Sequence, residues 1–404
     1  MNAYAYIFEN FQSPVQFNAM EREIQQLVQQ IHNAPGLTML VAAGAGTKAL
    51  SSLLGVAGAT RTLLEALVPY STASFNEFLE QTPEKYVAGK TARLLAGRAF
   101  TRARWLCGGP QPVIGLACTA TIITDRPKRG EHRAHLATWQ NERLVRHAIY
   151  LDKGARQREE EEDLVSRIML NSLAAALNID QSLPLRLCRA DQYTVKVFDF
   201  ARMVNRLLAG DVPYFGIHDN GRIRTQDAQP RMLLSGSFNP LHQGHLELAQ
   251  AVRTMTGRPV AFEISAVNVD KPALDQATLL ARMGQFAGRY PIFATTAPTF
   301  IKKARLFPGV TFVVGYDTVR RLLQPQYYQD DPARLQAALS EMQALGCAFL
   351  VAGRIDPENG RFQDLNDLNI PADFTNLFQA IPEAHFRNDI SSTELRQAGR
   401  KGSR

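Results

Sequence analysis

The sequence predicts an α/β protein with two domains. Its 404 residues exceed the size of a typical single domain. In both halves of the chain, short apolar runs alternate with stretches of helical spacing, which is typical of sheets covered by helices. The helix-breaking run Ser182-Leu183-Pro184 separates the halves. We therefore expect one domain at 1–182, a connecting segment with a hairpin at 183–228, and a second domain at 229–404.

The first half has the pattern of an α/β domain. Short apolar runs predict strands at 37–41, 112–120 and 133–139. A Gly-rich turn and a helix starting at Thr47 follow the first of them. A second helix is expected over 157–177, because Val165, Met169 and Leu173 recur at helical spacing. The acidic run at 159–162 suits the start of that helix, where the helix dipole favours anions.

The second half has the pattern of a doubly wound parallel sheet. Short apolar runs separated by helical stretches lie at 232–234, 260–264, 292–294, 311–314 and 348–351. A helix after the first of these strands has Leu248, Val252 and Met255 on one face. Before this domain, an apolar run at 212–217 ends at Asp219-Asn220-Gly221, which predicts a tight hairpin turn.

Composition restricts the setting of the protein. The four cysteines are scattered, so neither a disulfide framework nor a zinc knuckle is indicated. No run is apolar and long enough for a membrane span, and the N-terminus lacks a secretion signal, so we expect a cytoplasmic protein. The net charge of +7 suits a small anionic substrate. The basic clusters are short and contain no aromatic residues, which argues against nucleic acid. The sequence is compatible with a homo-oligomer.

The strongest motif is Gly236-Ser237-Phe238-Asn239-Pro240-Leu241-His242-Gln243-Gly244-His245, between a predicted strand and a predicted helix. Such a turn lies at the carboxyl edge of a parallel sheet, where ligands bind, and a helix N-terminus presents free N–H groups to phosphate. Gly236 lets the backbone approach a phosphate, and Gly244 leaves room between the imidazoles. His242 and His245 are then both placed to face a triphosphate.

Two imidazoles in this position suit nucleotidyl transfer. Its transition state spreads negative charge over oxygens that fixed donors must meet, and it needs little covalent help. The alternatives are that the two histidines lie on the surface without a function, or that they bind a metal ion. The histidines of zinc proteases, however, are four residues apart and accompanied by a glutamate, which is absent here.

A second motif, Ile390-Ser391-Ser392-Thr393-Glu394-Leu395-Arg396, lies near the C-terminus. Ser391 and Glu394 have the spacing of a capping box, so a helix is expected to start there and to offer its N-terminus to an anion. Alone, this motif indicates only a well-capped helix.

Together the motifs resemble the HxGH nucleotidyltransferases, in particular the nicotinamide and nicotinate mononucleotide adenylyltransferases of Rossmann-like fold. The resemblance covers about 231–399. It implies that His242 and His245 are catalytic and stabilise the transferring α-phosphate, with Mg²⁺ as cofactor and no metal ligand from the protein. The same resemblance implies ATP contacts from Gly236, Ser237, Phe238, Gly244, Gly315, Asp317, Ser392, Thr393 and Arg396.

The acceptor is less clear from the sequence. The family usually places a tryptophan near the nicotinamide ring, but Trp105 and Trp139 both lie in the first half of this chain. Lys271 is a candidate ligand for the acceptor phosphate, although it also suits an exposed loop. Arg282, on a predicted helix, is equally ambiguous.

The first half contains Gly44-Ala45-Gly46-Thr47-Lys48-Ala49 after a strand, which fits a dinucleotide-binding GxGxxA fingerprint. The acidic residue expected at the end of the next strand is missing, because Glu65 precedes the apolar run instead of following it.

Residues 17–177 instead resemble the CinA C-terminal family of nicotinamide-nucleotide amidases. The family's serine motif ESCTGG is replaced here by residues 42–47, and its lysine is missing, so we expect this half to be catalytically silent.

These observations predict an adenylyltransferase that acts on ATP and a phosphorylated acceptor in pyridine-nucleotide synthesis. The alternatives are an HxGH transferase that uses CTP or another acceptor, and a non-catalytic nucleotide-binding protein. A class I aminoacyl-tRNA synthetase shares HxGH-like geometry, but the closing ISST pattern and the short catalytic half argue against it.

Overall fold

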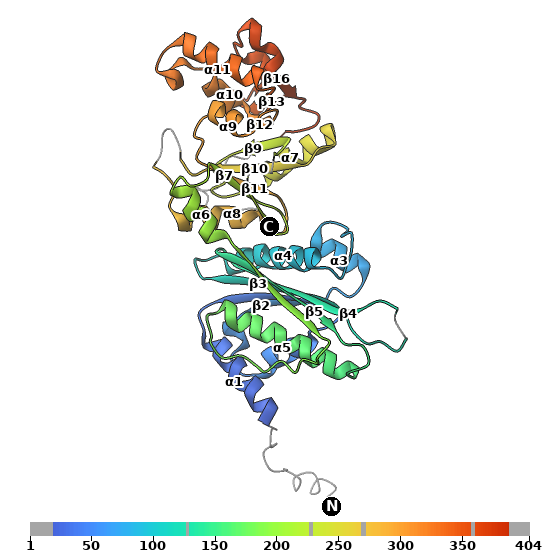
Figure 1. Ribbon diagram of the computed structural model, residues 1–404. Coiled ribbons are helices and arrows are strands. Elements are labelled where there is room, and N and C mark those ends of the chain that lie inside the picture. Colours follow the sequence, from blue (N-terminus) through green and yellow to red (C-terminus); the bar gives the residue numbers. More distant parts are fainter. Residues whose placement is uncertain (1–18, 127–128, 226–228, 268–271, 357–359, 388–404) are drawn as a thin grey trace, which may run out of the picture.

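The computed structural model contains two large sheets, each covered by helices on both faces and stacked along the long axis of the molecule, and a small two-stranded sheet (Figure 1). It describes residues 19–126, 129–225, 229–267, 272–356 and 360–387. Ser392, Thr393, Arg396 and Lys271 lie outside the described residues. None of the described helices is long and apolar enough to cross a membrane.

The first sheet has six strands in the order β2-β1-β3-β4-β5-β6. Their bounds are Leu37–Ala43 (β1), Leu63–Leu67 (β2), Val113–Thr121 (β3), His132–Trp139 (β4), Arg143–Leu151 (β5) and Gln192–Asp199 (β6). The pairs of β1 with β2 and β3 are parallel, and β3 to β6 pair antiparallel. One face packs against α3 (Thr72–Leu79) and α4 (Gly89–Cys107). The other packs against α1 (Ala19–Asn33), α2 (Thr47–Gly55) and α5 (Arg158–Ala176).

The second sheet has the order β16-β13-β12-β9-β10-β11-β7-β8. Its strands are Tyr214–Ile217 (β7), Ile223–Arg224 (β8), Met232–Ser235 (β9), Val260–Ser265 (β10), Ile292–Thr295 (β11), Thr311–Gly315 (β12), Ala348–Ala352 (β13) and Phe378–Ile381 (β16). The strands from β16 to β11 pair in parallel. Counted along the chain, their order across the sheet is 3-2-1-4-5-6, which is the doubly wound arrangement predicted from the sequence.

Helices cover both faces of this second sheet, because each parallel connection returns across one face. They are α7 (Gln243–Thr256), α8 (Gln276–Met283), α9 (Phe300–Leu306), α10 (Tyr316–Leu322) and α11 (Pro332–Ala344). The smaller elements are α6 (Phe200–Leu208), the β14 (Arg354–Ile355) and β15 (Phe362–Gln363) pair, and 3-10 turns η1 (Ala59–Arg61), η2 (Gly284–Phe286), η3 (Pro325–Tyr328), η4 (Leu365–Asp367) and η5 (Ala372–Leu377).

The segment 183–228, expected to connect the domains, contributes strands to both sheets. β6 pairs with β5 at the edge of the first sheet, and β7 pairs with β11 in the second. The predicted hairpin is present between β7 and β8. The sequence obscures the role of β6 because the side chains of an edge strand are largely exposed, and those of β6 are exposed or half-buried.

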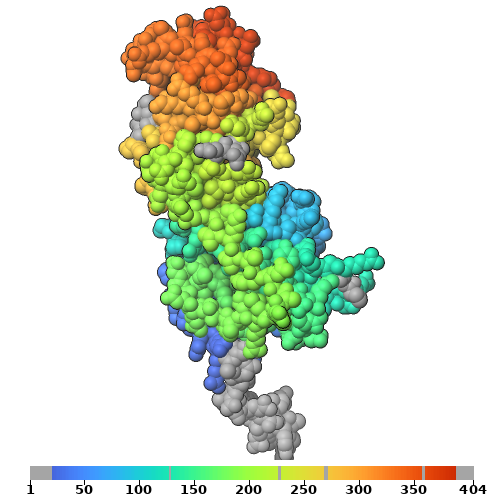
Figure 2. All heavy atoms as spheres, viewed as in Figure 1, coloured from blue at the N-terminus to red at the C-terminus, as the bar shows by residue number. Residues whose placement is uncertain are grey.

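The two units are packed tightly together. One hydrophobic core runs from α4 to the helices α7 and α8 of the second sheet. Gly97 and Gly288 bring their backbones so close that a Cβ atom on Gly97 would lie 2.5 Å from the nitrogen of Gly288. Glu80 forms ion pairs with Arg98 of α4 and with Arg289 of the second unit. The space-filling view shows the two units in contact along this boundary (Figure 2).

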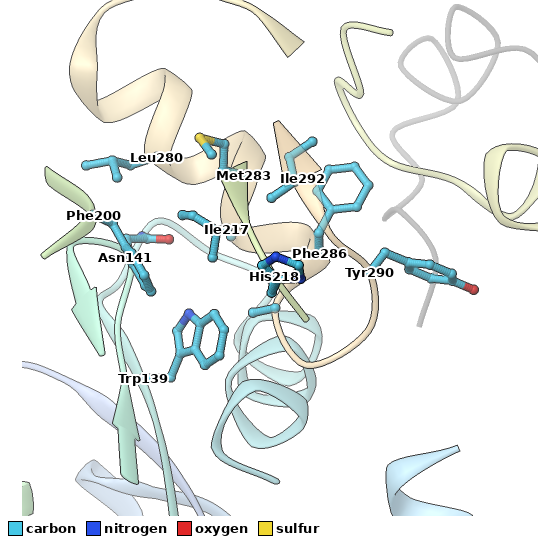
Figure 3. A pocket seen from close by; sticks show the side chains of 12 residues that line it. Trp139, Asn141, Phe200, Ile217, His218, Leu280, Met283, Phe286, Tyr290 and Ile292 are labelled. Atoms are coloured by element: carbon cyan, nitrogen blue, oxygen red, sulfur yellow. The ribbon is translucent and has the colours of Figure 1, made fainter. Parts of the chain in front are cut away.

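A small cavity lies in this boundary, between Trp139 and Phe200 on one side and Met283 and Phe286 on the other (Figure 3). Its volume is about 10 Å³, which is at the lower limit for one water molecule. This cavity therefore offers no room for a substrate.

Candidate active site

A large cavity lies at the carboxyl edge of the second sheet. The strand order reverses between β9 and β12, and ligands bind at such a reversal in open α/β sheets. The cavity has a volume of about 570 Å³, enough for a nucleotide-sized ligand. Its wall combines the ends of β9 and β10 with the segments after β11 and β12, and includes Ser235, Gly236, Ser237, Asn239, Ser265, Arg282, Thr299, Phe300, Lys303, Thr318, Arg321, Tyr327 and Tyr328.

The loop after β9 is held rigidly against the core. Phe238 is buried, has a left-handed φ of 41°, and packs edge-on against Phe262 and Phe286. A Cβ atom on Gly236 would lie 2.8 Å from the Phe238 ring, so only glycine fits there. The amide of Gln285 donates to the carbonyl of Phe238 (2.9 Å) and accepts from the backbone N–H of Leu241 (2.9 Å). The loop is thus fixed by the 3-10 turn that follows α8.

This loop delivers the two histidines to the start of α7. His242 is the N-cap residue of α7, His245 lies in its first turn, and Gly244 is buried between them. The ring centroids of the histidines are 3.7 Å apart. The backbone N–H of His242 donates to Nδ1 of His245 over 3.3 Å. Because Nδ1 accepts this bond, a neutral His245 carries its proton on Nε2, which leaves that N–H to donate to a ligand.

Burial keeps both imidazoles neutral. It lowers the pKa of His242, and burial together with the neighbouring His242 lowers the pKa of His245 to about 3. At neutral pH the pair therefore carries no net charge and can offer N–H donors. Neutral donors suffice for stabilising charge that develops on oxygen in a dry site.

Three histidines with lowered pKa values predict acid sensitivity of the fold. Burial lowers the pKa of His135 and His147 to about 4, as it lowers that of His245 to about 3. Between those values and the unfolded value of about 6.5, the unfolded chain binds more protons than the folded one, so stability falls as pH decreases. The slope is about 1.4 kcal/mol per pH unit for each such histidine. Urea unfolding midpoints should decline steadily from pH 7 to pH 4, whereas a flat profile would contradict the neutral, buried state.

Further polar groups surround the cavity. The hydroxyl oxygens of Ser235 and Thr299 are buried in its wall and have no hydrogen-bond partner among the described residues. The ammonium of Lys303 lies beside them and forms an ion pair with the fully buried Glu263 (2.6 Å). Buried polar atoms are nearly always paired, so the two orphaned hydroxyls indicate a surface shaped for a polar ligand.

The structure brings some predicted residues to the cavity and leaves others away from it. Gly236 and Ser237 line the cavity, and Phe238 lies beneath them. His242, Gly244 and His245 follow at the start of α7 and are not among the residues that line the cavity. Gly315 is the exposed N-cap of α10. The carboxylate of Asp317, in the first turn of α10, forms ion pairs with Arg354 and Arg320. The predicted contact between Asp317 and the nucleotide therefore requires that the ligand share this carboxylate with two guanidiniums.

Several cavity residues were missed by sequence reasoning. Ser265 is the last residue of β10, Thr299 lies four residues after the end of β11, and Tyr327 and Tyr328 follow α10. The first two had a signal, because strand ends in a parallel sheet meet at the ligand edge. The tyrosines had none, since no pattern predicts which loop returns to the cavity. Arg282, left ambiguous by the sequence, lines the cavity and donates to the carbonyl of Ser237 (3.3 Å).

The glycine-rich turn of the first half does not form an open phosphate site. The backbone N–H groups of Gly46 and Lys48 and the hydroxyl of Thr47 all donate to the carboxylate of Glu162, over 3.0 to 3.1 Å. The start of α2 is thus occupied by an anion from α5. A pyrophosphate bound at Gly44 to Ala49 would have to displace this carboxylate, because it would need the same donors.

The doubly wound sheet, the reversal of strand order and the histidine pair define a nucleotidyltransferase. The chain belongs to the cytidylyltransferase-like family, whose model matches residues 233–398. A relative from Gloeobacter violaceus, named "Probable nicotinate-nucleotide adenylyltransferase", is 30% identical over 186 residues, covering 42% of this chain and 85% of the relative. The predicted enzyme class is confirmed.

Solved structures of competence/damage-inducible proteins are similar to this chain as well. The competence/damage-inducible protein from Agrobacterium tumefaciens is 23% identical, with a TM-score of 0.33, and the match covers 39% of this chain and 96% of that one. The CinA superfamily protein from Escherichia coli is 16% identical with a TM-score of 0.29, covering 41% of this chain and 95% of that one.

Proposed function

We propose that the protein transfers the adenylyl group of ATP to nicotinamide or nicotinate mononucleotide and releases pyrophosphate. The observation that carries this proposal is the pair of neutral imidazoles at the N-terminus of α7, which directly follow the loop whose residues Gly236, Ser237 and Asn239 line the cavity at the strand reversal. The printed name of the Gloeobacter violaceus relative supports the acceptor class.

In this reaction an oxygen of the acceptor phosphate attacks the α-phosphorus of ATP. A new P–O bond forms, the bond between the α-phosphorus and the bridging oxygen breaks, and the electron pair leaves with pyrophosphate. The Nε2–H of His245 donates to a non-bridging oxygen of the α-phosphate, where negative charge increases. His242 fixes the tautomer of His245 through its backbone N–H. Neither histidine forms a covalent bond.

The cavity wall supplies complementary groups for both substrates. The guanidiniums of Arg282 and Arg321 lie at the wall and suit the phosphates. Tyr327 and Tyr328 offer aromatic faces for a pyridine ring, in place of the tryptophan that the resembled family uses. Lys271, Ser392, Thr393 and Arg396 remain proposed phosphate ligands.

Magnesium is proposed to arrive on the nucleotide. The described residues contain no group of three His, Cys, Asp or Glu side chains arranged to hold a metal ion. Mg²⁺ is commonly bound through substrate phosphates and retains several water molecules, so a protein cage is not required. Bound in this way, it would neutralise charge on the β- and γ-phosphates.

A substrate screen tests the proposal. The purified chain is incubated with Mg²⁺, ATP or CTP and a panel of phosphorylated acceptors, and pyrophosphate release is measured. We expect release with ATP and a pyridine mononucleotide. Release only with CTP would support the other donor, which the family description favours. Absence of release with every pair would support a non-catalytic nucleotide-binding protein.

The first half is proposed to be silent as an amidase. Its resembled family uses a serine nucleophile at the turn where this chain has Ala42 to Thr47, and Glu162 fills the adjoining N-terminus of α2. We expect no ammonia release when the full chain is incubated with nicotinamide mononucleotide. A serine-bearing member of the CinA family serves as the positive control, and ammonia above the blank would contradict the prediction.

A further inference from the structure

Basic side chains gather on the face of the first sheet that α4 covers. Four of them form what we call the basic cluster: Arg93, Arg133, His135 and Arg146. Arg146 on β5 pairs with Ala137 on β4, so the two side chains lie on the same face of the sheet. His135 lies on that face too, because it is two residues from Ala137 on β4. Arg93 comes from the second turn of α4. None of these residues belongs to the cavity of the nucleotidyltransferase site.

Two guanidiniums of the cluster converge on the first residue of α4. A Cβ atom on Gly89 would lie 3.2 Å from Nη1 of Arg146 and 3.8 Å from Nη1 of Arg93. The N-cap residue of this 19-residue helix, Ala88, provides no side-chain cap for the first N–H groups. The positive end of the helix dipole therefore meets two guanidiniums at one point.

The cluster lacks the anion that its charges require. Arg93 and Arg146 form no ion pair with a carboxylate among the described residues, and the ion pair of Arg133 with Glu131 is long, at 3.5 Å. Nε of Arg146 and Nδ1 of His135 are buried and have no hydrogen-bond partner in the described part of the chain. His135 is only 5% exposed, so water does not readily satisfy its ring.

The lowered pKa values of His135 and Arg93 reflect repulsion between the positive charges of the basic cluster. Burial and then Arg133, Arg146 and Arg93 lower the pKa of His135 to about 4. Burial, followed by Arg146 and Arg222, lowers the pKa of Arg93, and Asp219 offsets this only in part. Like charges held together at this cost are typical of a site whose ligand supplies the opposite charge.

We propose that Gly89, Arg93, His135 and Arg146 bind the phosphate group of a small molecule, at a site separate from the nucleotidyltransferase cavity. A phosphate presents several acceptor oxygens and two negative charges, which match two guanidinium forks and the free N–H groups of a helix start. Glycine at position 89 lets both guanidiniums lie close to the start of the helix.

The site is also in contact with the second unit. Nε of Arg93 donates to the carbonyl of Asn220 over 2.8 Å, and Asn220 lies in the turn between β7 and β8. A phosphate bound by Arg93 would therefore lie one side chain away from the edge hairpin of the catalytic sheet.

Binding of inorganic phosphate to the full chain tests the proposal, at constant ionic strength because chloride screens surface charge. Isothermal titration is carried out on the wild type, Arg93→Gln and Arg146→Gln. The matched control is Arg143→Gln, on the same strand as Arg146 but on the opposite face. Loss of a charge-assisted bond should weaken phosphate binding by about tenfold or more in the two test variants. The control should bind as the wild type does.

A further variant separates a loss of phosphate binding from a loss of folding. Gly89→Ala keeps both arginines and all charges, but its methyl group enters the space between them, so it should weaken phosphate binding while the melting temperature stays unchanged. Phosphate binding that is absent from the wild type, unchanged in Arg146→Gln, or weakened equally in Arg143→Gln would overturn the proposal. So would binding that His245→Ala abolishes, because it would then belong to the catalytic cavity.

Discussion

Replacing His245 by alanine should lower the turnover number by about two to three orders of magnitude, since one positioned donor to a developing oxyanion contributes about 3 to 4 kcal/mol. The loss should fall on the turnover number much more than on the Michaelis constant for ATP, because the donor acts where charge increases in the transition state. Steady-state kinetics with each substrate varied in turn measures both constants.

Gln243 provides the matched control for His245. It lies in the same first turn of α7, and its side chain is exposed. Gln243→Ala should retain wild-type turnover and the same melting temperature. If His245→Ala also retains near-wild-type turnover, the imidazole is no catalytic group and the proposed mechanism fails.

The second sheet was predicted well because its strands are buried on both faces. Such strands appear as continuous apolar runs, as at Val260–Ser265 and Ala348–Ala352, and each was located within one or two residues. β16 (Phe378–Ile381), at the edge of the second sheet, and β5 and β6 of the first sheet were not predicted. Arg146 and His147 interrupt the apolar pattern of β5, and β6 is an exposed edge strand. Their stability comes from pairing with distant strands, which local sequence does not encode.

The residues of the candidate site likewise fall into those that the sequence predicted and those that it did not. The turn from Gly236 to His245 is contiguous, so its composition and its place between strand and helix predicted the imidazole pair directly. Gln285, which holds that turn, lies about forty residues further along the chain and is an ordinary residue type in a short turn. Only the folded chain shows that its amide reaches the backbone of Phe238 and Leu241. Positioning residues of this kind leave no pattern in a single sequence.

The buried ion pair beside the cavity carries the second large prediction. Glu263 is fully buried, accepts from the hydroxyl of Thr295 (2.6 Å) and pairs with the Lys303 ammonium (2.6 Å). Removing one partner leaves an uncompensated charge in the core, which costs about 3 to 5 kcal/mol. Glu263→Gln should therefore lower the urea midpoint strongly, although glutamine can still accept from Thr295.

A matched ion pair lies two residues away on the same helix. Arg305 of α9 pairs with Glu341 at the same distance of 2.6 Å, but the side chains are 57% and 39% exposed. Exposed pairs contribute little, so Glu341→Gln should leave the midpoint nearly unchanged. Combining Glu263→Gln with Lys303→Met removes both charges. The loss of stability in this double variant should be clearly smaller than the sum of the losses in the two single variants, because no charge is then left buried without its partner. Additive losses, or equal midpoints for Glu263→Gln and Glu341→Gln, would show that the buried pair does not act as a unit.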